Sequence, residues 1–399
     1  MKKHQQKVLV LDGHQRSALA VVRSLGQQNL TVLVAATHKD SLAGVSRFCE
    51  QTFSYCDPLS DQKGFTRDIA HIVEKEGISL VIPVTDLTTY SLLKHAHLNN
   101  SIKVAAPSFN QYSKASDKIN LVQMAKRHNV PCPESFVVSS LKEWEDLKIS
   151  LKFPVIFKPS ASIQEYKGKL ITTSVKIVNS WREGKNLIES EQGFGSAFLV
   201  QEKIDGAGEG IFVLVDHGKL VTVFSHKRIR EKPPWGGVSV LCKSNIPADD
   251  TTKYAARLLN NLNWHGVAMV EFKRDYKTDI PYLMEINARF WGTLQLAVDC
   301  GIDFPYWQYL LFSGKAYPHG TTHIDKRLRW LLGDLDNLII SLRQELASRT
   351  LKWSFFKKKL IDFMLEFNRS TCYQVIRADD IKPFIWELKQ YIKELLKNG

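Results

Sequence analysis

The segment Tyr282-Leu-Met-Glu-Ile-Asn-Ala-Arg-Phe-Trp-Gly-Thr293 places a carboxylate, an amide and a guanidinium on one hydrophobic strand. Alternate side chains of a strand share a face, so Glu285, Asn287 and Arg289 point to one side of a sheet. The apolar residues between them point to the other side. The pattern predicts an oxygen-rich site for a metal ion and phosphate on one face of a sheet.

A second carboxylate, Glu271, lies in another hydrophobic strand, residues 266–273, and a short polar turn joins the two strands. If the strands pair as a hairpin, Glu271, Glu285 and Asn287 converge on one ion. Oxygen ligands without His or Cys favour Mg²⁺ or Mn²⁺ over zinc, and Mg²⁺ is normally shared with nucleotide phosphates. The competing interpretation is a structural ion pair with Arg289, because a buried charge is costly without a partner.

The composition of the 399-residue chain is that of a globular protein, with 44% hydrophobic and 24% charged residues. Its length predicts two or three packed units. No apolar run approaches the roughly 20 residues of a membrane helix, and no signal-peptide cleavage site follows the N-terminus, so we expect a cytoplasmic protein. The six scattered cysteines indicate reduced thiols. The net charge of +13 suits nucleic acid, acidic membrane surfaces or nucleotides, but without a nucleic-acid-binding motif we expect no nucleic-acid partner.

The N-terminal part alternates strand-like and helix-like segments, which predicts a parallel, doubly wound α/β sheet. The expected strands are residues 7–12, 31–36, 80–84 and 103–106, and the expected helices are residues 17–25, 64–76 and 87–97. The first turn, Asp12 to Ser17, lacks Gly-x-Gly-x-x-Gly, so we expect no NAD site. Two interpretations of Asp12 and Asp86 stay open: they line a substrate crevice, or they cap the helices that follow.

A new unit begins after a helix from Ser116 to about Arg127, which the prolines of Asn129 to Pro133 stop. Its strands read as antiparallel, and beyond about residue 325 the pattern becomes helical and basic. The expected strands are residues 153–158, 197–202, 210–215, 220–224, 266–273 and 280–287. We therefore expect an N-terminal α/β domain (residues 1–108), an α+β unit (109–325) and a basic helical C-terminal region (326–399).

Three lysines, Lys357 to Lys359, are flanked by aromatic residues in the C-terminal region. One interpretation is peripheral contact with a membrane or an anionic partner. The other is a helix packed on the body of the protein with its lysines in solvent.

Lysines also occur where a polyphosphate needs them. Lys158 ends an apolar strand, and Lys118 lies in the first turn of a helix; an ammonium group there is a compact charge for phosphate oxygens. The segment Gln201 to Glu209 follows a strand, where backbone groups at Lys203 and Ile204 can meet a flat heterocycle and Glu209 can accept bonds from sugar hydroxyls. The alternative for this segment is an ordinary glycine turn.

A basic stretch, His226 to Ser239, ends in a glycine pair that permits close backbone approach. Arg228 and Arg230 are its candidates for steadying a transferring phosphoryl group or a substrate carboxylate.

Taken in order, these motifs resemble the ATP-grasp superfamily over about residues 110 to 310. The stretch Glu285 to Ala297, followed by Gly301-Ile-Asp-Phe-Pro305, is similar to predicted carboxylate-amine ligases related to the carbamoyl phosphate synthase large chain. The resemblance implies ATP held between two α+β subdomains, with Mg²⁺ (or Mn²⁺) beside it. The implied assignments are Lys118 and Lys158 at the phosphates, the segment near Lys203 and Ile204 at adenine, Glu209 at ribose, Glu271, Glu285 and Asn287 at the metal, and Arg289 at the acylphosphate. Gln201 and Glu202 are further candidates for cofactor binding, and Arg228 and Arg230 for catalysis.

In the mechanism that the resemblance implies, the γ-phosphoryl group passes to a small-molecule carboxylate, and an amine attacks the acylphosphate. Two alternatives remain: a nucleotide-binding or regulatory protein that has lost catalysis, and phosphoryl transfer to a hydroxyl. The segment Ser160 to Lys169 departs from the family pattern, because it holds one glycine where a glycine-rich loop is common. Ala288 stands where proline is common. The sequence does not identify the substrates or the oligomeric state.

Overall fold

The computed structural model describes residues 6–95, 102–147, 151–166, 169–190, 197–320, 324–347, 353–368 and 370–398. The N-terminal domain has a parallel sheet of order β3-β2-β1-β4, which confirms the predicted doubly wound arrangement. Its elements are β1 (Lys7–Val10), α1 (Arg16–Gln27), β2 (Thr31–Ala36), β3 (Cys49–Ser54), α2 (Gln62–Glu76), β4 (Ile78–Ile82) and α3 (Asp86–Lys94).

Helices cover both faces of this sheet, because alternate strand residues point to opposite sides. Val8 and Val10 pack with α1 in one apolar cluster, whereas Leu9 and Leu33 pack with α2 in another. Two details differ from the sequence prediction. Strand β3 was missed because its sequence, CEQTFS, is a mostly polar edge strand, and the strand expected at residues 103–106 is a single bridge from Val104 to Val81. The end of the helix predicted over residues 87–97 lies outside the described residues.

A smaller antiparallel sheet of order β5-β10-β6-β9 follows. Trp144 fills its core and stacks on Trp181, with ring centroids 4.0 Å apart. The segment with few glycines after Lys158 forms a separate two-stranded pair, β7 (Ile163–Tyr166) and β8 (Lys169–Thr172). The other elements are α4 (Phe109–Ser116), α5 (Lys118–Arg127), β5 (Ser135–Val138), α6 (Leu141–Asp146), β6 (Val155–Pro159), β9 (Lys176–Val178), α7 (Trp181–Glu189) and β10 (Phe198–Glu202).

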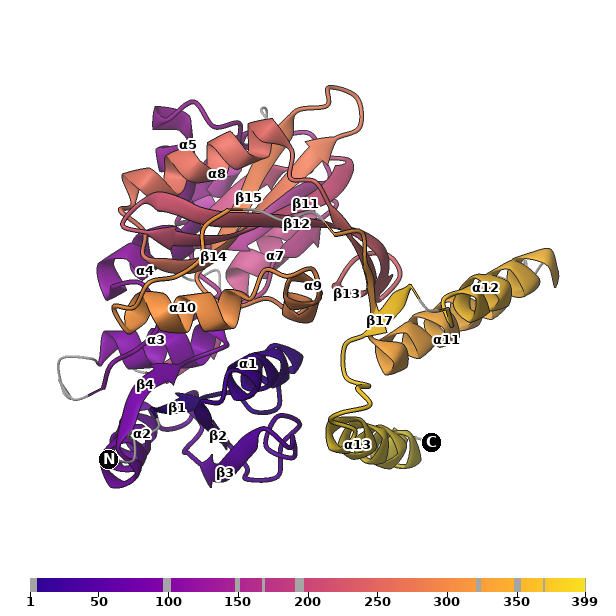
Figure 1. The fold of residues 1–399 in the computed structure, drawn as a ribbon. Helices are drawn as coiled ribbons and strands as arrows, with labels where there is room; N and C mark the ends of the chain where they lie inside the picture. The colour runs from indigo at the N-terminus through magenta and orange to yellow at the C-terminus, as the bar shows by residue number, and fades with distance from the viewer. Residues whose placement is uncertain are drawn as a thin grey trace, which may run out of the picture.

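The largest sheet has seven strands in the order β15-β14-β11-β12-β13-β16-β17. Helix α8 packs on one face, and α9 and α10 lie between the other face and the N-terminal domain (Figure 1). The elements are β11 (Gly206–Asp216), β12 (Lys219–Lys232), β13 (Val238–Asn245), α8 (Asp249–Asn261), β14 (Gly266–Asp275), β15 (Pro281–Asn287), α9 (Leu294–Asp299), α10 (Phe304–Phe312), β16 (Arg327–Arg329) and β17 (Thr371–Tyr373).

The C-terminal region is only partly helical, because it also supplies β16 and β17 to the large sheet. Helices α11 (Leu331–Ala347) and α12 (Trp353–Leu365) project from that sheet, while α13 (Lys382–Asn398) lies near the N-terminal domain (Figure 1). Buried Arg23 of α1 donates to Asp380, just before α13, at 2.9 Å. This ion pair connects α1 of the N-terminal domain to the segment before α13.

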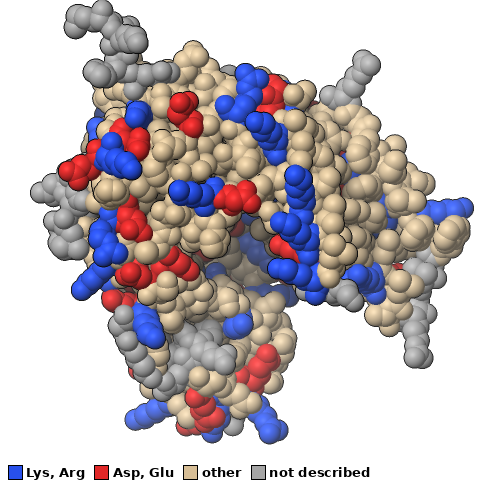
Figure 2. Space-filling model, turned by 90° about the horizontal axis from the view of Figure 1, so that it is seen from below, with Lys and Arg blue, Asp and Glu red and all other residues tan. Residues whose placement is uncertain are grey.

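Helix α12 buries none of its described residues, so the membrane or anionic-partner contact of its lysines stays a prediction. No helix within the described ranges is long and apolar enough to cross a membrane. Seen from below, one face of the molecule is hollowed, and Lys and Arg side chains gather along one side of the hollow (Figure 2).

Candidate active site

Two carboxylates and an amide meet where β14 pairs with β15. Glu271 lies directly opposite Glu285, and a register shift beside this pair leaves Met284 as an extra residue. The side chain of Asn287 donates to Oε1 of Glu285 at 3.0 Å and to Oε1 of Glu271 at 3.4 Å. The three side chains predicted as metal ligands therefore lie on one face and in contact.

The electrostatics of this group suit a cation. Burial and the neighbouring Glu285 raise the pKa of Glu271 to about 6, against the opposing effect of Arg228 and Arg289. Burial acts on Glu285 in the same direction, but Lys118 and the hydrogen bond from Asn287 outweigh it, so the pKa of Glu285 is lowered. An all-oxygen donor set with two adjacent carboxylates fits Mg²⁺ or Mn²⁺.

Two lysines approach these carboxylates from other elements. Asp117 caps α5 by accepting from the backbone of Ile119 and Asn120, which fixes the position of Lys118. Nζ of Lys118 lies 3.9 Å from Oε2 of Glu285 and 3.2 Å from Oγ of Ser162.

Lys158 projects from β6, and its Nζ lies 3.8 Å from the sulfur of Met284. Only 8% of Lys158 is exposed. This burial, against the attraction of Glu285, lowers the pKa of Lys158 to about 8. A cavity of about 240 Å³ lies among Lys118, the Ser160 to Ile163 segment, Glu285 and Asn287.

Arg289 connects this site to the N-terminal domain. Its Nε donates to Oδ2 of Asp86 at 2.6 Å, and its Nη2 donates to Oδ1 of Asn287 at 3.4 Å. Thr85, not Asp86, caps α3 with its side chain. Asp86 also lines the cavity beside Lys118, so the crevice interpretation of Asp86 describes the structure better than the capping one.

Asp12 forms hydrogen bonds within the N-terminal domain. Its buried carboxylate accepts from the backbone of Val84 and Thr85, at 2.9 Å each, and from the hydroxyl of Thr88 at 2.6 Å. It therefore holds the loop before α3 and not the helix that follows it in sequence.

A second cavity, of about 270 Å³, lies on the other side of Glu271. Arg228 lines it, donating to Glu271 at 3.3 Å and to Glu231 at 3.1 Å. Arg289 lines it as well, and so does Arg16 of α1, whose guanidinium lies 3.4 Å from the ring centroid of Trp330. Arg16 was not predicted from the sequence, because only the tertiary fold brings α1 to this sheet.

His226 was also missed as a residue of the second cavity. Its Nε2 lies 2.7 Å from the hydroxyl of Thr293. Burial, with Arg228 nearby, lowers the pKa of His226 to about 3. The cavity therefore combines guanidinium groups with a neutral imidazole.

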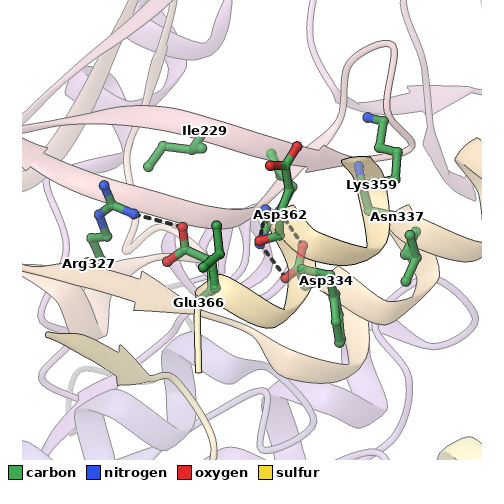
Figure 3. A pocket seen from close by; sticks show the side chains of 11 residues that line it. Ile229, Arg327, Asp334, Asn337, Lys359, Asp362 and Glu366 are labelled. Atoms are coloured by element: carbon green, nitrogen blue, oxygen red, sulfur yellow. Dashed lines mark hydrogen bonds and ion pairs between the residues drawn. The ribbon is translucent and has the colours of Figure 1, made fainter. Parts of the chain in front are cut away.

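Arg230 does not reach this site, contrary to the sequence prediction. Between Arg228 and Arg230 the pairing of β12 with β13 shifts by one residue at Ile229, and one extra residue turns the following side chain to the other face. Arg230 instead forms a bidentate pair with Asp334 of α11, at 2.6 and 2.7 Å. It lies in the wall of a separate cavity of about 420 Å³ among β12, α11 and α12 (Figure 3).

The residues predicted to bind adenine and ribose do not lie together in the structure. Gln201 points to the same face of β10 as Leu199, the residue that pairs with Lys158 of β6. Its Nε2 donates to Oγ of Ser135 at 2.8 Å. Its buried Oε1 has no hydrogen-bond partner among the described residues. Glu202 accepts from the backbone of Glu134 at 2.9 Å. Both residues thus lie at the C-terminal end of β10, an inner strand of the small sheet, from which the chain passes to the large sheet.

Beyond Glu202 the chain enters β11. The carbonyl of Ile204 accepts from Nζ of Lys273 at 2.7 Å. Burial is the main cause that lowers the pKa of Lys273, and the positive charge of nearby Lys203 adds to it. Glu209 pairs with Arg274 through two bonds of 2.6 and 3.0 Å. It sits opposite Phe272, on the face covered by α8, so the structure does not bring it to the carboxylates.

Comparisons with known proteins agree with this architecture. Residues 195–331 match the family described as ATP-grasp in the biosynthetic pathway with Ter operon. The chain is similar to the carbamoyl phosphate synthase large chain of Clostridium acetobutylicum, with 20% identity over 257 residues, covering 59% of this chain and 22% of that protein. The chain thus spans about a fifth of the length of this relative.

Two solved structures have similar folds. The biotin carboxylase domain of Hydrogenobacter thermophilus 2-oxoglutarate carboxylase, in complex with MgADP, ADP and bicarbonate, has a TM-score of 0.63 at 15% identity, covering 81% of this chain and 73% of that one. The L-amino acid ligase of Bacillus licheniformis has a TM-score of 0.60 at 15% identity, covering 78% and 75%. The fold is thus similar to the folds of these two structures, and residues 195–331 match an ATP-grasp family model.

Proposed function

We propose that the protein is an ATP- and Mg²⁺-dependent ligase that activates a small-molecule carboxylate as an acylphosphate and joins it to an amine. One observation carries the proposal: Glu271, Glu285 and Asn287 meet on one sheet face, with buried Lys118 and Lys158 approaching from other elements. Close carboxylates with close lysines suit a metal-bound polyphosphate, because each charge then gains a partner of opposite sign.

Glu271, Glu285 and Asn287 would hold Mg²⁺, with the amide of Asn287 rotated so that its oxygen faces the ion. The ion would neutralise charge on the phosphates. Lys118, which lines the first cavity, and Lys158, whose Nζ lies beside Met284, are assigned to phosphate oxygens. The unpartnered Oε1 of Gln201 is a buried acceptor, which suits the exocyclic amine of adenine.

The carboxylate substrate is assigned to the second cavity, where Arg16, Arg228 and Arg289 supply guanidinium groups. Glu271 lies at the wall of this cavity, and its partners Glu285 and Asn287 line the first one. The phosphoryl acceptor and donor therefore approach the same cation from two sides. The carboxylate oxygen attacks the γ-phosphorus and ADP leaves; the amine then attacks the acyl carbon and inorganic phosphate leaves. Positioning and charge neutralisation are the main contributions expected of the protein.

The similar proteins support a ligase. One named structure is an L-amino acid ligase, and another is a carboxylase domain complexed with MgADP and bicarbonate. Because this chain spans about a fifth of its carbamoyl phosphate synthase relative, its own substrates are not taken from that protein.

The proposal is tested by trapping with hydroxylamine. ATP, Mg²⁺ and a panel of carboxylates are expected to yield a hydroxamate and ADP with at least one acid. Glu285→Gln is expected to abolish turnover by weakening the metal site, whereas the matched variant Glu50→Gln, on edge strand β3 and outside the site, keeps it. ADP formed with a phosphorylated alcohol would replace the ligase by a phosphotransferase. No turnover with any acceptor, despite nucleotide binding, would leave a binding protein.

A further inference from the structure

A second group of possible metal ligands lies at the opposite end of the large sheet. Asp216 ends β11, His217 follows it in the turn to β12, and His265 directly precedes β14. Glu271 lies six positions after His265 along an extended strand, which corresponds to about 20 Å. This group, Asp216, His217 and His265, is therefore remote from the candidate active site.

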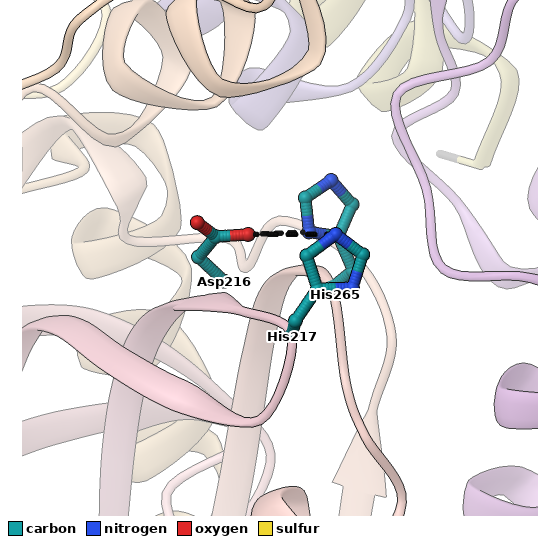
Figure 4. Close-up of side chains that lie close together, drawn as sticks. All are labelled: Asp216, His217 and His265. Carbon is teal, nitrogen blue, oxygen red and sulfur yellow. Dashed lines mark ion pairs between the residues drawn. The ribbon is translucent and has the colours of Figure 1, made fainter.

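The ligand atoms of the three side chains all lie within 4.8 Å of one another. Oδ1 of Asp216 is 3.1 Å from Nδ1 of His265 and 3.8 Å from Nε2 of His217. The imidazole rings stack, with centroids 4.4 Å apart, and the carboxylate oxygen faces them (Figure 4). Ligands about 2.1 Å from one ion are about 3.0 to 3.4 Å apart. The Asp216–His265 distance already has this value, whereas the exposed side chain of His217 has to move closer for all three to bind one ion.

The contact between Asp216 and His265 lacks the alignment of a hydrogen bond. Nδ1 of His265 is buried and has no hydrogen-bond partner among the described residues, although Oδ1 of Asp216 is 3.1 Å away. A buried nitrogen without an aligned partner is costly, and a shared cation would satisfy it.

The surrounding structure holds the group in place before any ion binds. The backbone N–H of Gly218 donates to the carbonyl of Trp264 at 2.7 Å, which fixes the turn against the residue before His265. The hydroxyl of Tyr317 donates to Oδ2 of Asp216 at 2.6 Å, leaving Oδ1 to face the histidines. A hydrogen bond to the second oxygen of a ligating carboxylate is a common feature of metal sites.

We propose that Asp216, His217 and His265 bind one first-row transition-metal ion of the Zn²⁺ class. Two imidazole nitrogens and one carboxylate oxygen are donors that such ions prefer and that Mg²⁺ does not. The ion joins the β11–β12 turn to the start of β14 and, through Tyr317, to the segment after α10. Three protein ligands leave a further position for water at the partly exposed surface.

The test uses the untagged full-length chain, stripped of metal with a chelator and titrated with ZnCl₂ in a calorimeter. One Zn²⁺ per chain is expected, with a dissociation constant of micromolar order, and Zn²⁺ is expected to raise the unfolding temperature. Loss of one of three ligands is expected to weaken binding by about tenfold or more. His217→Asn is the main variant, because residue 217 has a φ of +45°, which Asn tolerates.

His265→Ala is the second variant that removes a ligand, and circular dichroism checks that it is folded. His71→Ala, an exposed histidine on α2, is the matched control and is expected to bind like the wild type. Titration with Co²⁺ is expected to give visible bands without the near-ultraviolet thiolate band that a cysteine site would show.

Stoichiometric binding by His217→Asn at wild-type affinity, or no binding by the wild type at about 100 μM Zn²⁺, would overturn the proposal. Glu285→Gln is expected to keep Zn²⁺ binding, which separates this site from the proposed ligase site.

Discussion

The lowered pKa of Lys158 predicts that nucleotide affinity falls as pH rises from 7 to 9. Lys158 is 8% exposed, and burial, opposed by Glu285, lowers its pKa to about 8. The ammonium form binds phosphate and the neutral amine does not. The free protein therefore holds a charged Lys158 in about nine molecules of ten at pH 7 and in about one of ten at pH 9.

The expected effect is about a tenfold weaker affinity for a non-hydrolysable ATP analogue with Mg²⁺ at pH 9 than at pH 7. Binding raises the pKa of Lys158, because a phosphate stabilises the charged form, so binding near pH 8 takes up about half a proton. Calorimetry in buffers of different ionisation enthalpy measures both the affinity and this proton uptake.

Lys158→Arg is the matched variant, since arginine stays charged throughout this pH range. Its affinity is expected to be lower than that of the wild type at pH 7, owing to the larger side chain, but independent of pH up to 9. A wild-type affinity that is unchanged between pH 7 and 9 would refute the assignment of Lys158 to the phosphates. An equal fall in Lys158→Arg would assign the pH dependence to another group.

Three further predictions concern the arginines. Arg228→Ala is expected to lower kcat by about 100-fold per folded molecule, and normal acylphosphate formation in this variant would contradict the role assigned to Arg228 at the carboxylate. Arg230→Ala is expected to keep activity per folded molecule but to lose about 2 kcal/mol of unfolding free energy in urea, because Asp334 loses its bidentate partner; a loss of activity with unchanged stability would show that Arg230 acts in the site after all. Asp86→Asn releases Arg289 from its ion pair, so the KM for the carboxylate is expected to rise about tenfold while nucleotide affinity stays the same, and weakened nucleotide binding alone would place Arg289 at the phosphates.

Much of the face that carries the two carboxylates could be predicted because its geometry is local. Glu271, Glu285 and Asn287 lie on two strands joined by a short turn, so pairing was the simplest arrangement, and the alternation of side chains fixed their common face. The parallel N-terminal sheet followed from its alternating pattern in the same way. Residues without such periodicity were harder: β3 is a polar edge strand, and the C-terminal strands β16 and β17 have three residues each.

The sequence by itself determined the alternating strands and helices of the N-terminal part, the two carboxylate strands and the ATP-grasp resemblance, because strand alternation and short turns depend on neighbouring residues. Only the tertiary structure decided which side chains share a cavity. One extra residue at Ile229 sends Arg230 away from Arg228, and Arg16 reaches the second cavity across more than 200 positions of sequence, by the packing of α1 against the large sheet. A one-residue change of register reverses the face of a side chain, and long-range packing leaves no periodic trace in the chain. The sequence therefore predicts which strands carry the carboxylates better than it predicts which side chains line the cavities around them.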